Sequence, residues 1–212
     1  MLTVLSIRSD QIGREDADRF FEQLPGEHQQ RYAAYTHKKS RHRSICGLML
    51  LSYLLKNSNT GLTLSDIHYT AEGKPITDSD FGFSISHAGD FIVCAGGAGC
   101  DIGIDIEHVR ERDLSLFRDY FSPDEWIEIR SGSNPLFTFY RLWVRKEAVL
   151  KAAGMGITSS MSAIEVLRNE LMLNNVCYYI KDVPIAVGYV AAIAASRPIE
   201  EIAIKQFDTR LL

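Results

Sequence analysis

Residues 101–107 read Asp-Ile-Gly-Ile-Asp-Ile-Glu, and this strict alternation of isoleucine with glycine or acid is typical of a β-strand. Alternate side chains of a strand share a face, so the isoleucines are expected to point into a core. Asp105 and Glu107 then share the other face, next to Gly103, which has no side chain. The pattern predicts either a strand with one solvated face or a site for a hard cation such as Mg²⁺.

A second stretch, residues 143–151, reads Trp-Val-Arg-Lys-Glu-Ala-Val-Leu-Lys and lies in a helix expected over residues 136–153. Glu147 and Lys151 are four residues apart and share a helix face, while Lys146 lies on the adjacent stripe. Glu147 followed by Lys151 is the favourable order for an ion pair within the helix. The alternative puts Glu147 on the same cation as the two strand carboxylates, with the lysines facing anionic oxygens. Spacing alone leaves both interpretations open.

The periodicity along the chain predicts an α+β fold built from two similar halves. The halves are expected to be related by a pseudo-two-fold, each a small, mostly antiparallel sheet on a long helix, with the active site in the cleft between them. Element order recurs at an offset of about 100 residues, which divides the chain into residues 1–100 and 101–212. Strands are expected over 2–8, 67–70, 82–85, 91–95, 102–106, 162–167, 171–173, 176–181 and 189–194, and helices over 16–23, 39–55 and 114–120, then one capped by Ser122 or Asp124, and one over 136–153.

The composition of the 212 residues, 46% hydrophobic and 24% charged, is ordinary for a globular protein with a real core. No apolar run approaches the ~18–20 residues that span a bilayer, the N-terminus shows no secretory pattern, and the four cysteines form no C-x-x-C pair. We therefore expect a cytoplasmic protein with free thiols. The net charge of −4 argues against a general polyanion binder. The basic cluster at residues 37–43 is either a solvated helix start or a site for a compact phosphate ligand.

Two further segments have both a structural and a functional interpretation. Residues 84–87 read Ser-Ile-Ser-His at a strand end, and residues 73–75 read Gly-Lys-Pro in a turn. Both are ordinary turn or strand chemistry, yet Ser, His and Lys are also natural donors to phosphate oxygens. Neither a P-loop nor a G-x-G-x-x-G pattern occurs, so nothing points to a nucleotide triphosphatase or a dinucleotide-binding fold.

These motifs, taken in order, carry a resemblance to a known family. The order is Gly-Lys-Pro at 73–75, Phe-Ser-Ile-Ser-His at 83–87, Gly-Ile-Asp-Ile-Glu at 103–107, Phe-Ser-Pro-Asp-Glu at 121–125 and the helix motif at 143–151. The chain resembles the 4′-phosphopantetheinyl transferases over about residues 28–156. It looks like the larger Sfp-type branch, whose single chain holds two similar halves.

The resemblance implies a Mg²⁺-dependent transfer of 4′-phosphopantetheine from coenzyme A to a serine of an apo carrier protein, with release of adenosine 3′,5′-bisphosphate. It implies that Asp105, Glu107 and Glu147 hold the metal on the coenzyme A pyrophosphate, and that Lys151, helped by Lys146, faces the phosphoryl group under attack. Glu147, Glu125 or a metal-bound water would accept the serine proton, and Glu147 is favoured. The residues implied for the nucleotide end of coenzyme A are Lys74, Ser86 and His87, joined by Arg43 and Ser44 and by Arg31 and His28.

The resemblance also carries expectations about partners and departures. The first half would bind the nucleotide, and the second would hold the metal and dock the carrier, with apolar Ile157, Met161, Ile164 and Val166 as the docking surface. The carrier is expected to be acidic, and the enzyme monomeric. Which pathway is served, whether fatty-acid, polyketide or nonribosomal-peptide, stays open. Ser84 and Ala88 replace the usual Asn and Ser of the family, so altered local hydrogen bonding is expected rather than lost activity.

Two other functions compete with the transferase. A metal-dependent phosphoester hydrolase could use the same carboxylates, and it would release adenosine bisphosphate from coenzyme A without an acceptor. A non-catalytic module could bind coenzyme A or carrier domains through the basic cluster, and it would show no turnover and no need for Mg²⁺.

Overall fold

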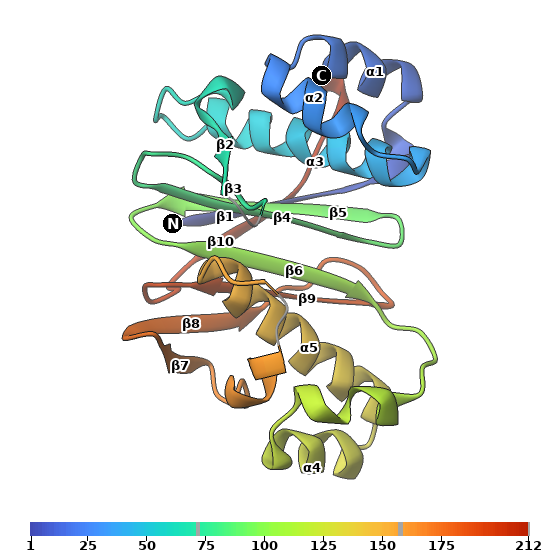
Figure 1. The fold of residues 1–212 in the computed structure, drawn as a ribbon, viewed down its shortest axis with the longest axis vertical. Helices are drawn as coiled ribbons and strands as arrows, with labels where there is room; N and C mark the ends of the chain where they lie inside the picture. Colours follow the sequence, from blue (N-terminus) through green and yellow to red (C-terminus); the bar gives the residue numbers. More distant parts are fainter. Residues whose placement is uncertain (71–72, 157–158, 212) are drawn as a thin grey trace.

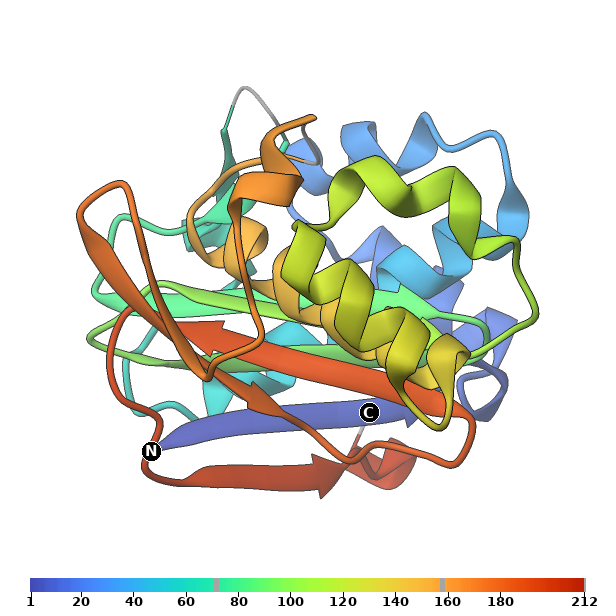
Figure 2. The same ribbon diagram turned by 90° about the horizontal axis from the view of Figure 1, so that it is seen from below.

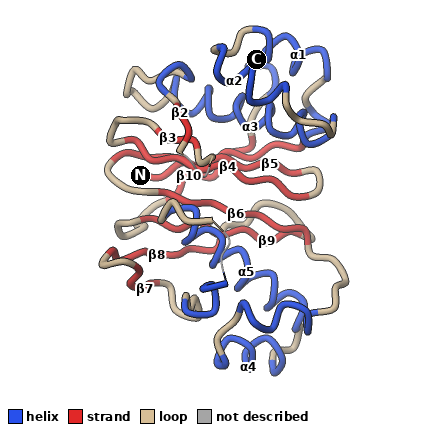
Figure 3. Tube along the Cα trace, viewed as in Figure 1, coloured by secondary structure: helices blue, strands red, loops and turns tan. Residues whose placement is uncertain are grey.

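The computed structural model describes residues 1–70, 73–156 and 159–211. Two four-stranded sheets lie back to back in the middle of the molecule, and helices cover the outer face of each sheet (Figure 1). Figure 3 shows the same layering, with strands in the centre and helices toward both ends. The expected α+β class, with two sheets that each pack against helices, is confirmed.

The first half builds one sheet and the helical layer above it. Strand order in this sheet is β10-β1-β5-β4, and β2 and β3 form a separate small hairpin. Short 3-10 helices at Ser9–Gln11 and Leu64–Asp66 join longer elements. The elements are β1 (Leu2–Arg8), α1 (Arg14–Glu22), α2 (Gly26–Ala33), α3 (Lys38–Lys56), β2 (His68–Tyr69), β3 (Pro75–Ile76), β4 (Phe81–Ala88) and β5 (Phe91–Ala98).

The second half repeats this plan. Its strand order is β6-β9-β8-β7, so β6 pairs with β9 and β9 with β8, as β1 pairs with β5 and β5 with β4. All of these pairs are antiparallel, which bears out the expected recurrence of element order. The elements are β6 (Ile102–His108), α4 (Pro123–Ser131), α5 (Pro135–Ala152), β7 (Glu170–Leu173), β8 (Val176–Asp182) and β9 (Tyr189–Ala195).

One strand crosses the boundary expected at residue 100. After β9 the chain returns to the first sheet, where β10 (Ile202–Gln206) pairs in parallel with β1, Leu2 opposite Ile202. Figure 2 shows the dark red β10 beside the blue β1. Phe207 follows the strand and is buried against Tyr53 of α3, with ring centroids 5.1 Å apart. The first sheet is therefore completed by residues from the far end of the sequence.

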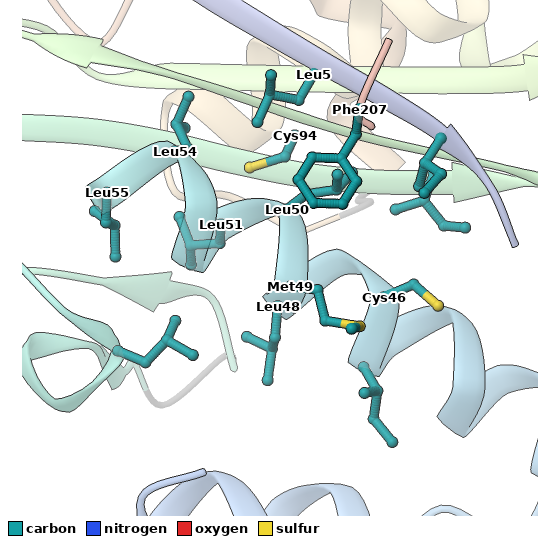
Figure 4. Packing of buried hydrophobic residues seen from close by; sticks show 14 of the residues in the cluster. Leu5, Cys46, Leu48, Met49, Leu50, Leu51, Leu54, Leu55, Cys94 and Phe207 are labelled. Atoms are coloured by element: carbon teal, nitrogen blue, oxygen red, sulfur yellow. The ribbon is translucent and has the colours of Figure 1, made fainter. Parts of the chain in front are cut away.

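Successive side chains of a strand point to opposite faces of its sheet, and the buried apolar side chains form three layers. Leu5 and Ile7 of β1 point toward α3, and Figure 4 shows Leu5 among Leu51, Cys94 and Phe207. A second layer lies between the two sheets, and it contains Ile102, Ile104 and Ile106. The third lies around α5 and the outer face of the second sheet. The isoleucines of β6 therefore face a core as expected, and their partners on the strand face α5.

One local expectation is wrong: the strand expected over 162–167 is a 3-10 helix, Ser159–Ala163, followed by irregular chain. The helix expected over 114–120 is confirmed, and it is of the 3-10 type, Leu114–Tyr120. Ser122 does cap α4, because its hydroxyl accepts the amide of Glu125 and Pro123 takes the first helical position.

Two further findings concern the chain's chemical setting. Among the described residues, no helix combines the length and apolarity required to cross a membrane. The four cysteines are free thiols as expected, with Cys46 and Cys94 buried and Cys100 and Cys177 partly exposed.

Candidate active site

The floor of the candidate site is the face of β6 that lies against α5. Gly103 marks the closest approach, since a Cβ there would lie 1.9 Å from the carbonyl oxygen of Ala148 and 2.5 Å from the amide nitrogen of Ala152. Real Cβ contacts essentially never fall below 3.0 Å, so only glycine fits. The helix thereby lies directly over the strand that carries Asp105 and Glu107, and Asp105 is only 6% exposed.

Helix α5 contributes Glu147 and Lys151, one turn apart. Lys151 Nζ donates to Asp105 Oδ1 at 2.7 Å and to the carbonyl oxygen of Ile104 at 3.1 Å. This lysine therefore ties the helix to the strand carboxylate, and the Glu147 side chain is buried close by. Strand carboxylates and helix residues that were expected to share a site do lie together.

Burial and the charge of Asp105 raise the pKa values of Glu107 and Glu147. The pKa of Glu147 is raised to about 7, first by burial and next by the charge of Asp105, while Lys151 opposes the shift. The pKa of Glu107 is also raised, again by burial and then by Asp105. Neighbouring like charges disfavour ionisation in this way. A cation placed among these oxygens would relieve the repulsion.

The first half reaches the same site through the end of β4. The hydroxyl of Ser86 donates to Asp105 Oδ1 at 2.7 Å, which links the two halves directly. The next residue, His87, has its pKa lowered by desolvation and by the nearby guanidinium of Arg43. Arg43 Nη1 in turn donates to the carbonyl oxygen of Gly89 at 3.1 Å. One of the residues expected at the nucleotide end of coenzyme A, Ser86, is thus hydrogen-bonded directly to the carboxylate of Asp105.

Lys74 and Arg31 lie at the edge of this group. Lys74 Nζ donates to the carbonyl oxygen of Ala152 at 3.3 Å, at the C-terminal end of α5. Burial lowers the pKa of Lys74, and the charge of Asp101 opposes that shift. Arg31 Nη2 donates to the carbonyl oxygen of Gly73 at 3.0 Å, so it supports the turn that carries Lys74. Both cations therefore border the junction of the halves.

The two remaining candidate binding residues of the first half, Ser44 and His28, differ in solvent exposure. Ser44 follows Arg43 on α3 and is partly exposed. His28 is 1% exposed, and its ring nitrogens are hydrogen-bonded to Tyr69 Oη at 2.7 Å and to the carbonyl oxygen of Leu64 at 2.8 Å. His28 therefore has no free nitrogen to offer a ligand in this structure. It can act only through Tyr69, whose ring lies 4.1 Å from the guanidinium of Arg31.

Glu125 and Lys146 form a fully buried ion pair inside the second half. Lys146 Nζ lies 2.7 Å from Glu125 Oε2, both side chains are 0% exposed, and the lysine also donates to the carbonyl oxygens of Met161 and Ile164. Glu125 accepts the amides of Ser122 and Val166. The pair ties α4, α5 and the chain after residue 160 together. Neither group presents any surface to a substrate in this structure.

The oxygen donors suit a hard cation, although they are not arranged as a finished site. In residues 1–70, 73–156 and 159–211, no three His, Cys, Asp or Glu side chains stand so that they could hold a metal ion. Asp105 Oδ2 is nevertheless buried, and it has no hydrogen-bond partner among the described atoms. A buried oxygen of this kind calls for a donor or a cation. Binding a metal would require the neighbouring carboxylates to turn toward it.

Arg110 and Arg112 are residues near the site that the sequence motifs do not indicate. Their charges lower the pKa of Glu107, with Arg112 acting more strongly than Arg110, against the larger effects of burial and Asp105. Arg112 also lies over the ring of Phe117 at 4.7 Å. The only available signal was their position three and five residues after Glu107.

The docking surface expected after Gly156 is wrong for the residues that the structure describes. Met161, Ile164 and Val166 are at most 3% exposed and belong to the core around α5. Ile157 lies outside the described residues. The apolar spacing that suggested a docking surface is the spacing of core side chains.

Comparison with known proteins identifies the family. A model of the 4′-phosphopantetheinyl transferase N-terminal region matches residues 13–99, and one of the 4′-phosphopantetheinyl transferase superfamily matches residues 101–194. The chain is 28% identical over 200 residues to the 4′-phosphopantetheinyl transferase Sfp of Bacillus subtilis strain 168, covering 88% of each chain.

Two further relatives agree. A Bacillus subtilis 4′-phosphopantetheinyl transferase is 31% identical over 157 residues, which cover 71% of this chain and 69% of the relative. The 4′-phosphopantetheinyl transferase gsp of Aneurinibacillus migulanus is 30% identical over 147 residues, which cover 68% and 62%. The chain therefore belongs to the 4′-phosphopantetheinyl transferase superfamily and is an Sfp-type 4′-phosphopantetheinyl transferase.

Proposed function

We propose that this transferase moves 4′-phosphopantetheine from coenzyme A to a serine hydroxyl of an apo carrier protein. The serine oxygen forms a bond to the β-phosphorus of coenzyme A, and the bond from that phosphorus to the bridging oxygen breaks. Adenosine 3′,5′-bisphosphate leaves with the bond electrons. The observation that carries this proposal is the convergence at Asp105 of Ser86 from the first half and Lys151 from α5.

We propose that Asp105, Glu107 and Glu147 hold Mg²⁺ beside the diphosphate. The partnerless Oδ2 of Asp105 and the pKa values of Glu107 and Glu147, both raised by burial and by the charge of Asp105, support this assignment. When bound, Mg²⁺ would neutralise diphosphate charge and favour departure of the leaving group. The protein's own contribution is then mainly positioning and fixed positive charge, as in other phosphoryl transfers.

Lys151 is the proposed cation for the phosphoryl group under attack. Its ammonium group is 2.7 Å from Asp105, and its side chain keeps 30% of its surface exposed, so it can also reach an anionic oxygen. Glu147, on the same helix face, is the proposed acceptor of the serine proton, directly or through water. Lys146 and Glu125 are proposed to act indirectly, because their buried ion pair fixes the helix that carries Glu147 and Lys151.

The first half is proposed to bind the nucleotide end of coenzyme A, including its 3′-phosphate, and the second to hold the metal and dock the carrier. Two concavities border one residue each of the proposed binding group, Lys74 and Arg31, and neither is lined by Ser86 or His87. One of about 270 Å³ lies between the halves beside Lys74, and one of about 470 Å³ lies in the first half between Arg31 and the start of α3. The binding group comprises Arg43, Ser44, Lys74, Ser86, His87 and Arg31, with His28 acting through Tyr69.

The partner is proposed to be an acidic acyl or peptidyl carrier protein of fatty-acid, polyketide or nonribosomal-peptide synthesis. A monomer is proposed because one chain supplies both halves of the site. The free thiols agree with a reducing compartment, and we propose the cytoplasm.

The test is transfer of a fluorescent coenzyme A derivative to purified apo carrier proteins in the presence of Mg²⁺. Wild-type protein should label at least one carrier, whereas Asp105→Ala and Glu147→Ala should abolish labelling while thermal unfolding stays cooperative. Asp78→Ala is the matched control, since its carboxylate is 96% exposed and it lies outside the site. Retained labelling in both site variants would remove these residues from the mechanism. Release of adenosine bisphosphate from coenzyme A in the absence of any carrier protein would show that the enzyme is a hydrolase and not a transferase.

A further inference from the structure

The turn between β4 and β5 is held by a tyrosine of the other half. Tyr189, the first residue of β9, accepts the amide of Asp90 at its hydroxyl oxygen, 3.3 Å away. Its ring stacks on His108 with centroids 4.6 Å apart and 17° between the planes, and it meets Phe91 edge-on at 4.8 Å. The phenol is therefore fixed on two sides, and its hydroxyl points at the turn.

The turn is shaped to receive this hydroxyl. Gly89 has φ +53°, in the left-handed region that favours glycine, and a Cβ there would lie 2.5 Å from Tyr189 Oη. On the far side of the same residue, the carbonyl oxygen of Gly89 accepts Arg43 Nη1 at 3.1 Å. The turn thus lies between the tyrosine of the second half and the arginine of the first.

Arg43 depends on this turn for its orientation. Its Nε is buried and has no hydrogen-bond partner among the described atoms. The hydrogen bond from Nη1 to the carbonyl oxygen of Gly89 therefore orients the guanidinium. The same β4 end carries His87 and, one residue earlier, Ser86, which is bonded to Asp105. A shift of the turn would therefore move the arginine relative to the rest of the site.

We propose that Tyr189 is a positioning residue for coenzyme A: it fixes the β4–β5 turn, and the turn fixes the guanidinium of Arg43 for a phosphate group. This inference rests on the proposed role of Arg43 in binding coenzyme A. The contact also joins the two halves at the site, so nucleotide affinity depends on how the second half meets the first.

The first experiment compares Tyr189→Phe with wild-type enzyme in steady-state transfer assays. Removing the hydroxyl while keeping the ring should raise KM for coenzyme A about three- to tenfold, as expected for one lost hydrogen bond. KM for the carrier and kcat should stay within about twofold of wild type. Tyr178→Phe is the matched control, since it removes the same atom from β8 of the same sheet. Equal changes in both KM values, or an unchanged KM for coenzyme A, would overturn the proposal.

Two double variants test the route. In an Arg43→Ala background, Tyr189→Phe should raise KM for coenzyme A no further, because the arginine it positions is gone. Gly89→Ala should raise this KM more in wild type than in Tyr189→Phe, because the phenylalanine removes the oxygen that the new Cβ meets at 2.5 Å. If the effects on KM for coenzyme A were independent in either double variant, Tyr189 would not act on Arg43 through the β4–β5 turn. Failure of wild-type protein to label any carrier would instead refute the proposed function, so the two failures are distinguishable.

Discussion

The two halves share the order of three strands, β1-β5-β4 and β6-β9-β8, but differ in the side chains that the first of these strands turns toward the long helix. In the first half, β1 turns Leu5 and Ile7 toward α3, and both are at most 2% exposed. In the second half, β6 turns Gly103, Asp105 and Glu107 toward α5. The same architecture therefore accommodates an apolar helix–strand interface in one half and a charged one in the other.

The difference shows how the second half can give up apolar contact at that interface. Its aromatic core lies one to two turns before Glu147 on α5, where Phe139 and Trp143 stack with centroids 5.9 Å apart and Phe117 meets both rings edge-on. Aromatic side chains bury large areas, so this cluster can offset the apolar contacts that the acidic strand lacks. Apolar packing and charge are thus assigned to successive turns of one helix.

The largest effect should come from the buried ion pair that anchors this helix. Lys146→Met should lower the free energy of unfolding by about 3–5 kcal/mol, because Glu125 would stay buried without its cation. Urea denaturation measures the loss. The double variant Glu125→Gln, Lys146→Met should lose less than the single one. A single variant as stable as wild type would show that the second half does not depend on this pair.

Asp105→Asn should separate activity from stability. It removes the charge next to Lys151 while keeping the shape, so kcat/KM should fall about 10²–10³-fold, as for loss of one preorganised charge in an active site. On the corresponding strand of the first half, β1, Ile7→Val should lower the free energy of unfolding by about 0.5–1.5 kcal/mol and leave kcat unchanged. Transfer assays and urea denaturation of both variants check this. Similar activity losses in the two variants would show that β1 and β6 do not differ in their importance for catalysis.

Glycines in the two halves should respond differently to an added methyl group. Gly103→Ala places a Cβ against backbone atoms of α5, and overpacking should cost about 1–3 kcal/mol together with most activity. Gly47→Ala in α3 has one close contact, with the Cγ2 of Ile85 at 2.8 Å, beside ordinary contacts at 3.8 Å and 3.9 Å, and a helical alanine regains about 0.5–1 kcal/mol. Its net effect on the unfolding free energy should be close to zero. Comparable losses at both positions would mean that α3 and α5 are equally constrained.

The smallest effect concerns thiol reactivity. Burial raises the pKa of Cys46 to about 12 and also raises that of Cys94, so at pH 8 both stay protonated and should not react with iodoacetamide. Cys100 and Cys177 are partly exposed and should be alkylated in the folded protein. Mass spectrometry should show up to two additions before denaturation and four afterwards. Early modification of Cys46 or Cys94 would show that the apolar layer beneath α3 opens readily.

Much of the fold could be predicted because periodicity reports local geometry. The alternation over 101–107 and the helical spacing before Ala153 gave β6 and α5 within a few residues. The segment after Gly156 misled because Met161, Ile164 and Val166 are apolar at spacings that suit a strand. Their burial depends on Lys146, which binds the carbonyl oxygens of that irregular chain.

The site was predictable to the level of its motifs and no further. The family resemblance assigned Lys146 and Glu147 to one site, although a helix sends neighbouring side chains in different directions. Lys146 enters the core and Glu147 faces the strand. Tyr189 could not be found from the sequence, because its importance arises from contact with a turn almost 100 positions earlier.

The return of β10 to the first sheet has a consequence for biosynthesis. Residues 202–206 leave the ribosome after every other strand, so the β1 edge they cover stays open while the second half is being made. Open strand edges invite pairing with other chains. Nascent chains should therefore be most prone to association during that interval, and an amino-terminal fragment used in a split-enzyme design would need a grafted copy of β10.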